Sequence, residues 1–210
     1  MADFTKVIET LMAGDIATLE GLVKKAIDDK VAAKEILDDG LIKGMDIVGE
    51  KMQAADMFIP EVLRSAKAMS NALELLRPLL TAEDMKASGK VVIGTVKGDL
   101  HDIGKNLVKM MLETAGFEVV DLGVDVEPKG FVDAVKGNNS NVLALSALLT
   151  TTMPVMKQTV DAITEAGLRD GVKILIGGAP VTKQYADQIG ADGYAADAGS
   201  ATMLLKKLLG

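Results

Sequence analysis

The sequence contains no cysteine and no tryptophan, and only one histidine among its 210 residues. The absence of cysteine excludes disulfides, cysteine-ligated zinc and cysteine-held iron–sulfur clusters. No apolar run reaches about 18 residues, and the start of the chain, MADFTKVIET, lacks the charged-then-apolar order of a signal segment. The net charge of -7 argues against a nucleic-acid-binding surface, which needs clustered lysine and arginine. We therefore expect a soluble, cytoplasmic protein that binds neither nucleic acid nor membrane.

The first eighty or so residues have a helical period and no strand-like run. Apolar side chains recur at spacings of three and four across residues 31–52, which predicts a helix there. Asp15 can cap a second helix over residues 16–28, and Pro60 suits the first position of a third. A short helix before Met12 makes four. The simplest arrangement is a four-helix bundle with short connections.

The second half changes character after a polar stretch, residues 81–90, which we interpret as a linker. Beyond it, short apolar runs alternate with helical patterns, as in a parallel sheet covered on both faces. The runs occupy residues 91–96, 117–122, 141–146, 172–177 and 193–196, and the helices are predicted at 104–115, 128–135, 153–166, 181–189 and 198–209. The sequence thus predicts an all-α domain, residues 1–85, and an α/β doubly wound five-stranded parallel sheet of Rossmann or flavodoxin type, residues 86–210, with strand order 2-1-3-4-5.

In that strand order, the loops after strands 1, 3 and 4 meet at one edge of the sheet, where ligands bind in such folds. The lone histidine, His101, and Asp99 lie in the first of these loops, in the stretch GDLHDIGKN. No GxGxxG or GxxxxGK[ST] pattern follows strand 1, so a dinucleotide or triphosphate site is not expected. A phospho-receiver domain would need an aspartate at the position of Ser146.

A single histidine cannot hold a bare metal ion tightly, because zinc-type sites need three or four protein ligands. A metal already held by a macrocycle needs only an axial ligand, and one imidazole then suffices. Asp99 stands where a carboxylate could accept the second N–H of the His101 ring and fix its tautomer. The alternative is a partly exposed loop histidine with an ordinary hydrogen bond.

Three short motifs then coincide in order and spacing: Asp99-x-His101-x-x-Gly104, Ser146-x-Leu148 and Gly177-Gly178. In these motifs the chain resembles the corrinoid (cobalamin-binding) proteins of anaerobic methyltransferase systems and the cobalamin-binding module of methionine synthase. Residues 57–73 look like the helical cap of that family, so the resemblance extends over nearly the whole chain.

The resemblance implies a cofactor, cobalamin or a related corrinoid, bound with its own benzimidazole base detached from cobalt. His101 would be the lower axial ligand of the cobalt, and Asp99 would orient His101. Thr152 stands where methionine synthase has the serine that completes this relay. Further residues would surround the nucleotide tail or cover the corrin: Gly104, Ser146, Leu148, Thr150, Gly177, Gly178 and Ala198 for the tail, and Met52, Ile59 and Val62 for the cap. The alternatives are turn chemistry for the glycines, helix capping for the threonines and bundle core for the cap residues.

The implied function is that of a methyl carrier, which is not catalytic alone. Its implied partners are a substrate-specific methyltransferase, a corrinoid-to-acceptor methyltransferase acting on tetrahydrofolate or a thiol, and a reductive activating protein. A cobalamin-dependent sensor, a mutase-type binding subunit and a flavodoxin-like protein without cobalt are the alternatives. Nothing in the sequence selects among methylamines, methanol, quaternary amines and methyl ethers as the methyl source.

Overall fold

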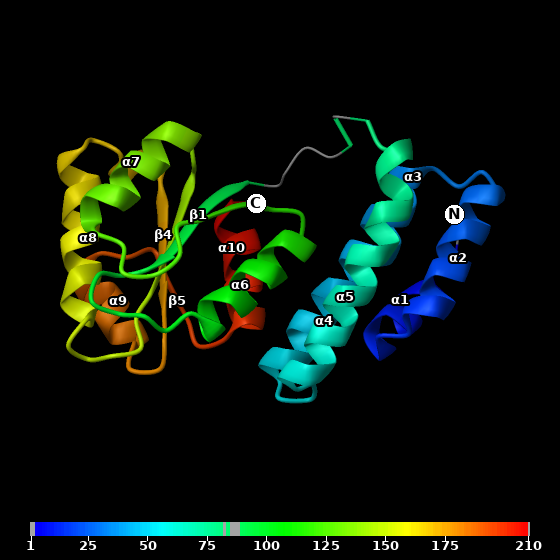
Figure 1. Cartoon of the computed structure of the whole chain (residues 1–210), viewed down its shortest axis with the longest axis horizontal. Coiled ribbons are helices and arrows are strands. Elements are labelled where there is room, and N and C mark those ends of the chain that lie inside the picture. The colour runs from blue at the N-terminus through cyan, green and yellow to red at the C-terminus, as the bar shows by residue number, and fades with distance from the viewer. Residues whose placement is uncertain (1–2, 82, 85–88, 210) are drawn as a thin grey trace. The chain divides into compact units, whose positions relative to one another are not determined.

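The computed structural model describes residues 3–81, 83–84 and 89–209, and these form two compact units (Figure 1). The first unit comprises the N-terminal helices, and the second comprises a parallel sheet with its covering helices. The domain boundary expected after residue 85 lies outside the described residues, as does part of the expected linker, residues 81–90. Within the described part of the chain, no helix combines the length and the apolar character that crossing a membrane requires.

The N-terminal unit contains the four helices that the sequence predicts, if α3, η1 and α4 are counted as the one uninterrupted helix that they form. The helical elements are α1 (Thr5–Ala13), α2 (Ile16–Asp28), α3 (Ala33–Glu35), η1 (Ile36–Ile42), α4 (Lys43–Gln53), α5 (Ile59–Leu76) and the 3₁₀ turn η2 (Arg77–Leu79). Asp15 caps α2 as expected, since its side chain accepts a hydrogen bond from the backbone N–H of Thr18 at 3.1 Å. Gly44 lets α4 approach α1 closely, because a Cβ there would lie 2.7 Å from Leu11 Cδ2.

One element of this unit differs from the regular helix expected over residues 31–52. Its middle, η1 (Ile36–Ile42), is a π-helix, in which backbone hydrogen bonds span five residues instead of four. Ile36 and Leu41 stand five positions apart, and both are fully buried. Residues five apart stand about 140° apart around a regular α-helix, and the wider turn brings these two side chains closer to one face.

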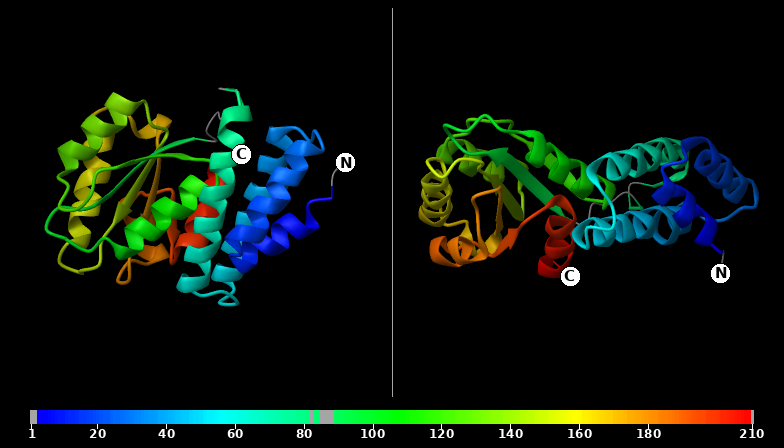
Figure 2. Two further views of the ribbon diagram at one scale, coloured as in Figure 1. Left: turned by 45° about the vertical axis from the view of Figure 1, so that its right-hand side comes forward. Right: turned by 90° about the horizontal axis from the view of Figure 1, so that it is seen from below.

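The second unit is a five-stranded parallel sheet with strand order β2-β1-β3-β4-β5, which confirms the predicted topology. The strands are β1 (Lys90–Thr95), β2 (Glu118–Asp121), β3 (Val142–Ser146), β4 (Lys173–Gly177) and β5 (Gly193–Ala195). The helices are α6 (Ile103–Thr114), α7 (Pro128–Asn138), α8 (Met153–Glu165), α9 (Lys183–Ile189) and α10 (Ala198–Leu209), with the 3₁₀ turn η3 (Arg169–Gly171) before β4. Helices α7, α8 and α9 cover one face of the sheet, and α6 and α10 cover the other (Figure 1 and Figure 2).

The central strands are buried on both faces, which is why they read as continuous apolar runs. In β1, Val91 and Val92 are fully buried although their side chains point to opposite faces. Phe131 of α7 packs over Gly94, where a Cβ would lie 2.7 Å from Phe131 Cε1. Thr95 is the last residue of β1 and is in register with Ser146, the last residue of β3. The loops after these strands therefore leave the sheet side by side.

Candidate functional site

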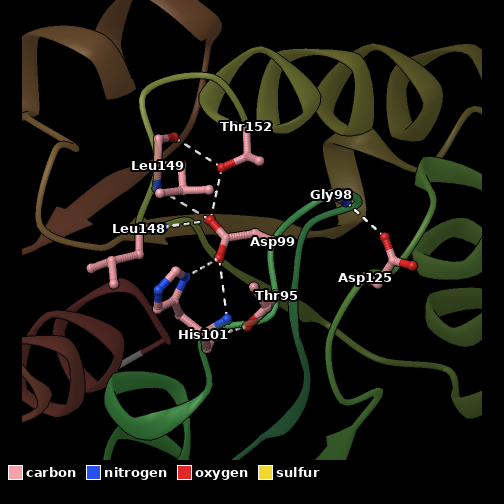
Figure 3. A network of polar contacts seen from close by, with 8 residues as sticks. All are labelled: Thr95, Gly98, Asp99, His101, Asp125, Leu148, Leu149 and Thr152. Carbon is pink, nitrogen blue, oxygen red and sulfur yellow. Dashed lines mark hydrogen bonds and ion pairs between the residues drawn. The ribbon is translucent and has the colours of Figure 1, made fainter.

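The site is built on the carboxyl edge of the sheet, where the loop after β1 meets the loop after β3 (Figure 3). Asp99 in the first loop is fully buried, and its carboxylate points toward the second loop. Its Oδ2 atom accepts hydrogen bonds from the backbone N–H of Leu148 at 2.8 Å and of Leu149 at 3.2 Å. The Thr152 hydroxyl lies 2.7 Å from the same oxygen and donates to it. The Asp99 Oδ1 atom lies 2.7 Å from Nδ1 of His101.

These contacts determine the charge of Asp99. Burial by itself raises the pKa of the carboxyl, but the hydrogen bonds from His101, Thr152 and the Leu148 amide outweigh that effect and hold the pKa well below its ordinary value. Asp99 is therefore a carboxylate at neutral pH. A carboxylate can only accept hydrogen bonds, so the neutral His101 ring carries its proton on Nδ1 and leaves Nε2 with a free lone pair.

The other side of the imidazole is open, because the His101 side chain is 52% exposed. The neighbouring Leu100 and Ile103 side chains are also exposed, at 71% and 83%, which places apolar surface beside the ring. Among the described residues, no group of three or more histidine, cysteine, aspartate or glutamate side chains could hold a metal ion. One oriented imidazole in apolar surroundings fits a metal that arrives inside a large, mostly apolar macrocycle, and does not fit a bare hydrated ion.

Thr152 is buried and immediately precedes α8, where its hydroxyl could either cap the helix or contact Asp99. Its hydroxyl is directed to Asp99 and to the carbonyl of Leu149 at 2.9 Å, rather than to an amide of α8. The hydroxyl has one proton, so it donates to one of these acceptors at a time. The structure thus brings together the His101–Asp99–Thr152 series that the resemblance implied.

Two contributors to this network escaped the sequence analysis. Thr95 is fully buried, and its hydroxyl donates to the carbonyl of His101 at 2.9 Å, which fixes the backbone that carries the imidazole. A hydroxyl at the end of an otherwise apolar strand was the signal for it. The backbone amides of Leu148 and Leu149 are the second contributor. No side-chain pattern could have revealed them, because any residue type carries an amide.

The glycines predicted to make room for a nucleotide tail have different surroundings. Gly178 has a φ of +128°, and a Cβ there would lie 1.9 Å from the carbonyl oxygen of Ala147. A Cβ at Gly177 would lie 3.0 Å from the carbonyl oxygen of Ala195. Packing within the protein therefore already requires glycine at position 178, and it leaves little room for a side chain at Gly177. In the first turn of α6, by contrast, a Cβ at Gly104 would meet nothing within 4 Å.

The remaining predicted tail residues lie along the same edge. Ser146 ends β3 and is partly buried, whereas Leu148 and Thr150 are exposed in the loop that follows. Ala198 is buried at the start of α10. Their contact with a nucleotide tail stays a prediction.

The predicted cap residues belong to the helical unit and differ in exposure. Val62 is fully buried, Met52 is partly buried, and Ile59 is 48% exposed. Phe58, directly before α5, is 67% exposed. Ile59 and Phe58 therefore keep free apolar surface, and contact of the cap residues with a corrin stays a prediction.

The chain is similar to cobalamin-binding proteins along most of its length. Two B12 binding domains match the chain, one over residues 89–203 and one over residues 4–77. A corrinoid protein of Desulfitobacterium hafniense is 40% identical over 205 residues, which cover 96% of this chain and 95% of that protein. Dimethylamine corrinoid protein 1 of Methanosarcina acetivorans is 45% identical over 176 residues, 83% of each chain.

A solved structure supports the same assignment. The crystal structure of the methanol:cobalamin methyltransferase complex of Methanosarcina barkeri contains a chain with a TM-score of 0.82 and 30% identity, and the match covers 97% of this chain and 78% of that chain. The chain therefore belongs to the corrinoid proteins of methyltransferase systems, and its cofactor is cobalamin or a related corrinoid.

Proposed function

We propose that this protein is a methyl carrier that binds its corrinoid with the cofactor's own base detached and with His101 as the lower axial ligand. The observation that carries the proposal is the contact between His101 Nδ1 and Asp99 Oδ1 at 2.7 Å, which leaves Nε2 of a half-exposed ring free to bind cobalt. Since the chain has one histidine, no other imidazole can take this role. The bound corrinoid supplies a cobalt centre that can accept and release a methyl group.

The three residues of the network have separate tasks in this proposal. His101 binds the metal through Nε2, and Asp99 holds the proton on Nδ1 and thereby makes Nε2 a stronger donor. Thr152 donates to the other carboxylate oxygen, so it stabilises the charge that Asp99 needs. If Nε2 held a proton in place of the metal, the Asp99 carboxylate beside Nδ1 would stabilise the resulting imidazolium as an ion pair.

The surroundings support two further parts of the proposal. Ser146, Leu148, Thr150, Gly104, Gly177, Gly178 and Ala198 would surround the nucleotide tail, because they follow or flank strand ends at the same edge of the sheet. The predicted cap residues Met52, Ile59 and Val62 of the helical unit would form a cover over the reactive face of the corrin. The free apolar surface at Phe58 and Ile59 supports that role, whereas the fully buried Val62 would act by anchoring the helix that carries Ile59. An apolar cover keeps water away from a bound methyl group.

The partners follow from the relatives. A methyltransferase for the methyl donor is the first partner, because the solved relative belongs to a methanol:cobalamin methyltransferase complex. Methylated amines and methanol are the donors to test first, since other relatives are named for dimethylamine and trimethylamine. A second methyltransferase, acting on tetrahydrofolate or a thiol, and a reductive activating protein complete the proposed cycle.

The axial role of His101 has a direct spectroscopic test. The protein is prepared with natural histidine or with ¹⁵N-histidine, loaded with hydroxocobalamin under anaerobic conditions and reduced to the paramagnetic cobalt state. Because there is one histidine, the label marks one imidazole. We expect nitrogen superhyperfine splitting in the electron paramagnetic resonance spectrum whose multiplicity changes with the label. His101→Ala should lose the labelled splitting. If the multiplicity of the splitting is the same with natural histidine and with ¹⁵N-histidine, the cofactor's own base, and not His101, binds the cobalt.

The carrier role needs a separate assay. Protein loaded with corrinoid is incubated with a methylamine or methanol methyltransferase and its substrate, and the methylated cofactor is followed by its absorption spectrum. Methylation that depends on His101 supports the carrier role. Corrinoid binding without methylation by any of these enzymes would favour the sensor alternative.

A further inference from the structure

We infer that Asp125 is a positioning residue for the axial histidine, acting through the backbone of the loop that carries His101 and Asp99. This inference deepens the proposed function and rests on it for its consequence in cofactor binding. Asp125 lies in the loop between β2 and α7. Figure 3 shows it on the far side of the His101 loop from Thr152.

The contacts of Asp125 are reciprocal and span two consecutive residues. Its Oδ1 atom accepts a hydrogen bond from the backbone N–H of Gly98 at 2.7 Å. Its own backbone N–H donates to the carbonyl oxygen of Asp99 at 3.1 Å. Asp125 thus holds the backbone of Gly98 and Asp99, and these two hydrogen bonds involve neither the Asp99 carboxylate nor the His101 imidazole.

We call Asp125 and its two hydrogen bonds, to Gly98 and to Asp99, the clamp. The backbone conformation of the clamp restricts which residues can form it. Asp125 has a φ of +56°, and Gly98 opposite it has a φ of +82°. Residues other than glycine rarely adopt positive φ, and aspartate and asparagine are the side chains that tolerate it best. A residue with a Cβ keeps this unfavourable backbone conformation only when contacts with its surroundings hold it there. The two hydrogen bonds to residues 98 and 99 are such contacts.

Neighbouring contacts extend the clamp along the strand direction. The N–H of Val126 donates to the carbonyl of Thr95 at 3.0 Å, and Val126 pairs with Val96 as a parallel bridge. Lys97 and Glu127 form an ion pair beyond this bridge. The loop after β2 therefore continues the sheet past the end of β1, and it holds the His101 loop from the side opposite to the loop after β3.

The reason that this clamp matters is the geometry of the imidazole. The His101 ring is half exposed, and its hydrogen bond to Asp99 sets its orientation. Asp99 is in turn placed by donors from the loop after β3 on one side and by Asp125 on the other. Loss of the Asp125 contacts lets the Asp99 backbone shift, so the imidazole loses its fixed tautomer and direction.

Three substitutions separate the components of this effect. Asp125→Asn keeps both an acceptor and a side chain that tolerates positive φ. Asp125→Gly keeps the backbone conformation but removes the acceptor, and Asp125→Ala removes the acceptor and strains the backbone. The position is exposed, so none of these changes opens a cavity in the core. Asp133→Ala is the matched control, because Asp133 is an exposed aspartate of the same unit that pairs only with Lys129 on its own helix.

The first readout uses protein without cofactor. Since His101 is the only histidine, ¹⁵N-histidine labelling gives the NMR signals of one imidazole, and the nitrogen shifts at mildly alkaline pH show which nitrogen carries the proton. We expect the Nδ1–H tautomer in the parent protein, in Asp125→Asn and in Asp133→Ala. Asp125→Gly and Asp125→Ala should show exchange between the two tautomers. Nitrogen shifts in Asp125→Gly equal to those of the parent would overturn the positioning role.

The second readout is hydroxocobalamin affinity, which connects the clamp to the proposed function. We expect Asp125→Gly to bind on the order of tenfold more weakly than Asp125→Asn, the lower end of the usual effect of groups that orient a metal ligand. If the tautomer changes but Asp125→Gly and His101→Ala both bind hydroxocobalamin like the parent protein, the proposed axial role of His101 fails and the positioning of the ring by Asp125 stands. If His101→Ala weakens binding and Asp125→Gly does not, the positioning role in cofactor binding is refuted.

Discussion

Replacing Thr152 by valine tests how much the hydrogen bond from the Thr152 hydroxyl to the Asp99 carboxylate stabilises the protein. Valine has nearly the shape of threonine but cannot donate a hydrogen bond to Asp99. The Asp99 carboxylate is fully buried and receives the Thr152 hydroxyl at 2.7 Å, so solvent does not compensate for the loss. A hydrogen bond to a charged group contributes about 1.5–3 kcal/mol. Asp99 keeps its donors from Leu148, Leu149 and His101, and we therefore expect the free energy of unfolding to fall by about 2 kcal/mol.

The two tyrosines make the assay specific to the sheet unit. Tyr185 lies in α9 and Tyr194 in β5, and the chain has no tryptophan, so tyrosine fluorescence reports the unfolding of the α/β unit alone. For a urea dependence of about 2 kcal/mol/M, a loss of about 2 kcal/mol lowers the unfolding midpoint by about 1 M.

Two further variants control this measurement. Thr151→Val changes the exposed neighbouring threonine and should move the free energy of unfolding by less than about 0.5 kcal/mol. Thr152→Ser keeps the hydroxyl and removes one methyl group, which should destabilise by about 0.8 kcal/mol. If Thr152→Val is as stable as Thr151→Val, the hydroxyl does not support the buried carboxylate and the relay loses its structural basis.

Three other predictions concern charge and space around the same loop. Lys105 is buried and donates to both carboxylate oxygens of Asp121 at 2.7 and 2.8 Å, so Lys105→Met should lower the free energy of unfolding of the α/β unit by about 3 kcal/mol in the same urea assay. Burial raises the pKa of Asp121, but Lys105 and the Gly123 amide lower it below its ordinary value overall. The ion pair of Lys105 and Asp121 therefore stabilises the protein fully above about pH 4 and less as the pH falls below that value. The urea midpoint should drop below about pH 4 in the parent protein, and it should drop less steeply in Lys105→Met. Gly104→Ala should leave the unfolding midpoint unchanged or higher, because its Cβ meets nothing, yet weaken hydroxocobalamin binding in a spectroscopic titration if the nucleotide tail passes there.

Much of the fold could be predicted because its signals are local. The alternation of short apolar runs with helical patterns located both ends of all five strands to within one residue, and the handedness of crossovers then gave the strand order. The π-helical segment Ile36–Ile42 could not be predicted in this way. Its apolar positions also match a regular helix, and only packing in the bundle selects the wider turn.

In the site, too, contacts within one loop could be predicted from the sequence and contacts between loops could not. The pattern Asp99-x-His101 made a hydrogen bond between these two residues expected, because they are two positions apart. The contact between Asp99 and Thr152 joins residues 53 positions apart, and it was expected only through the resemblance to a known family. The contacts of Asp125 had no sequence signal, since they are made to backbone atoms of another loop.

The sequence by itself therefore determined the two kinds of domain, the strand order, the single available imidazole and the aspartate beside it. Periodicity and short spacing carry this information because they act within one element or one loop. The tertiary structure decided which groups surround the Asp99 carboxylate, that packing requires glycine at position 178, and which loop bonds to the backbone of Gly98 and Asp99. Such contacts exist only after the strands pair, because pairing is what brings the loops after β1, β2 and β3 to the same edge of the sheet.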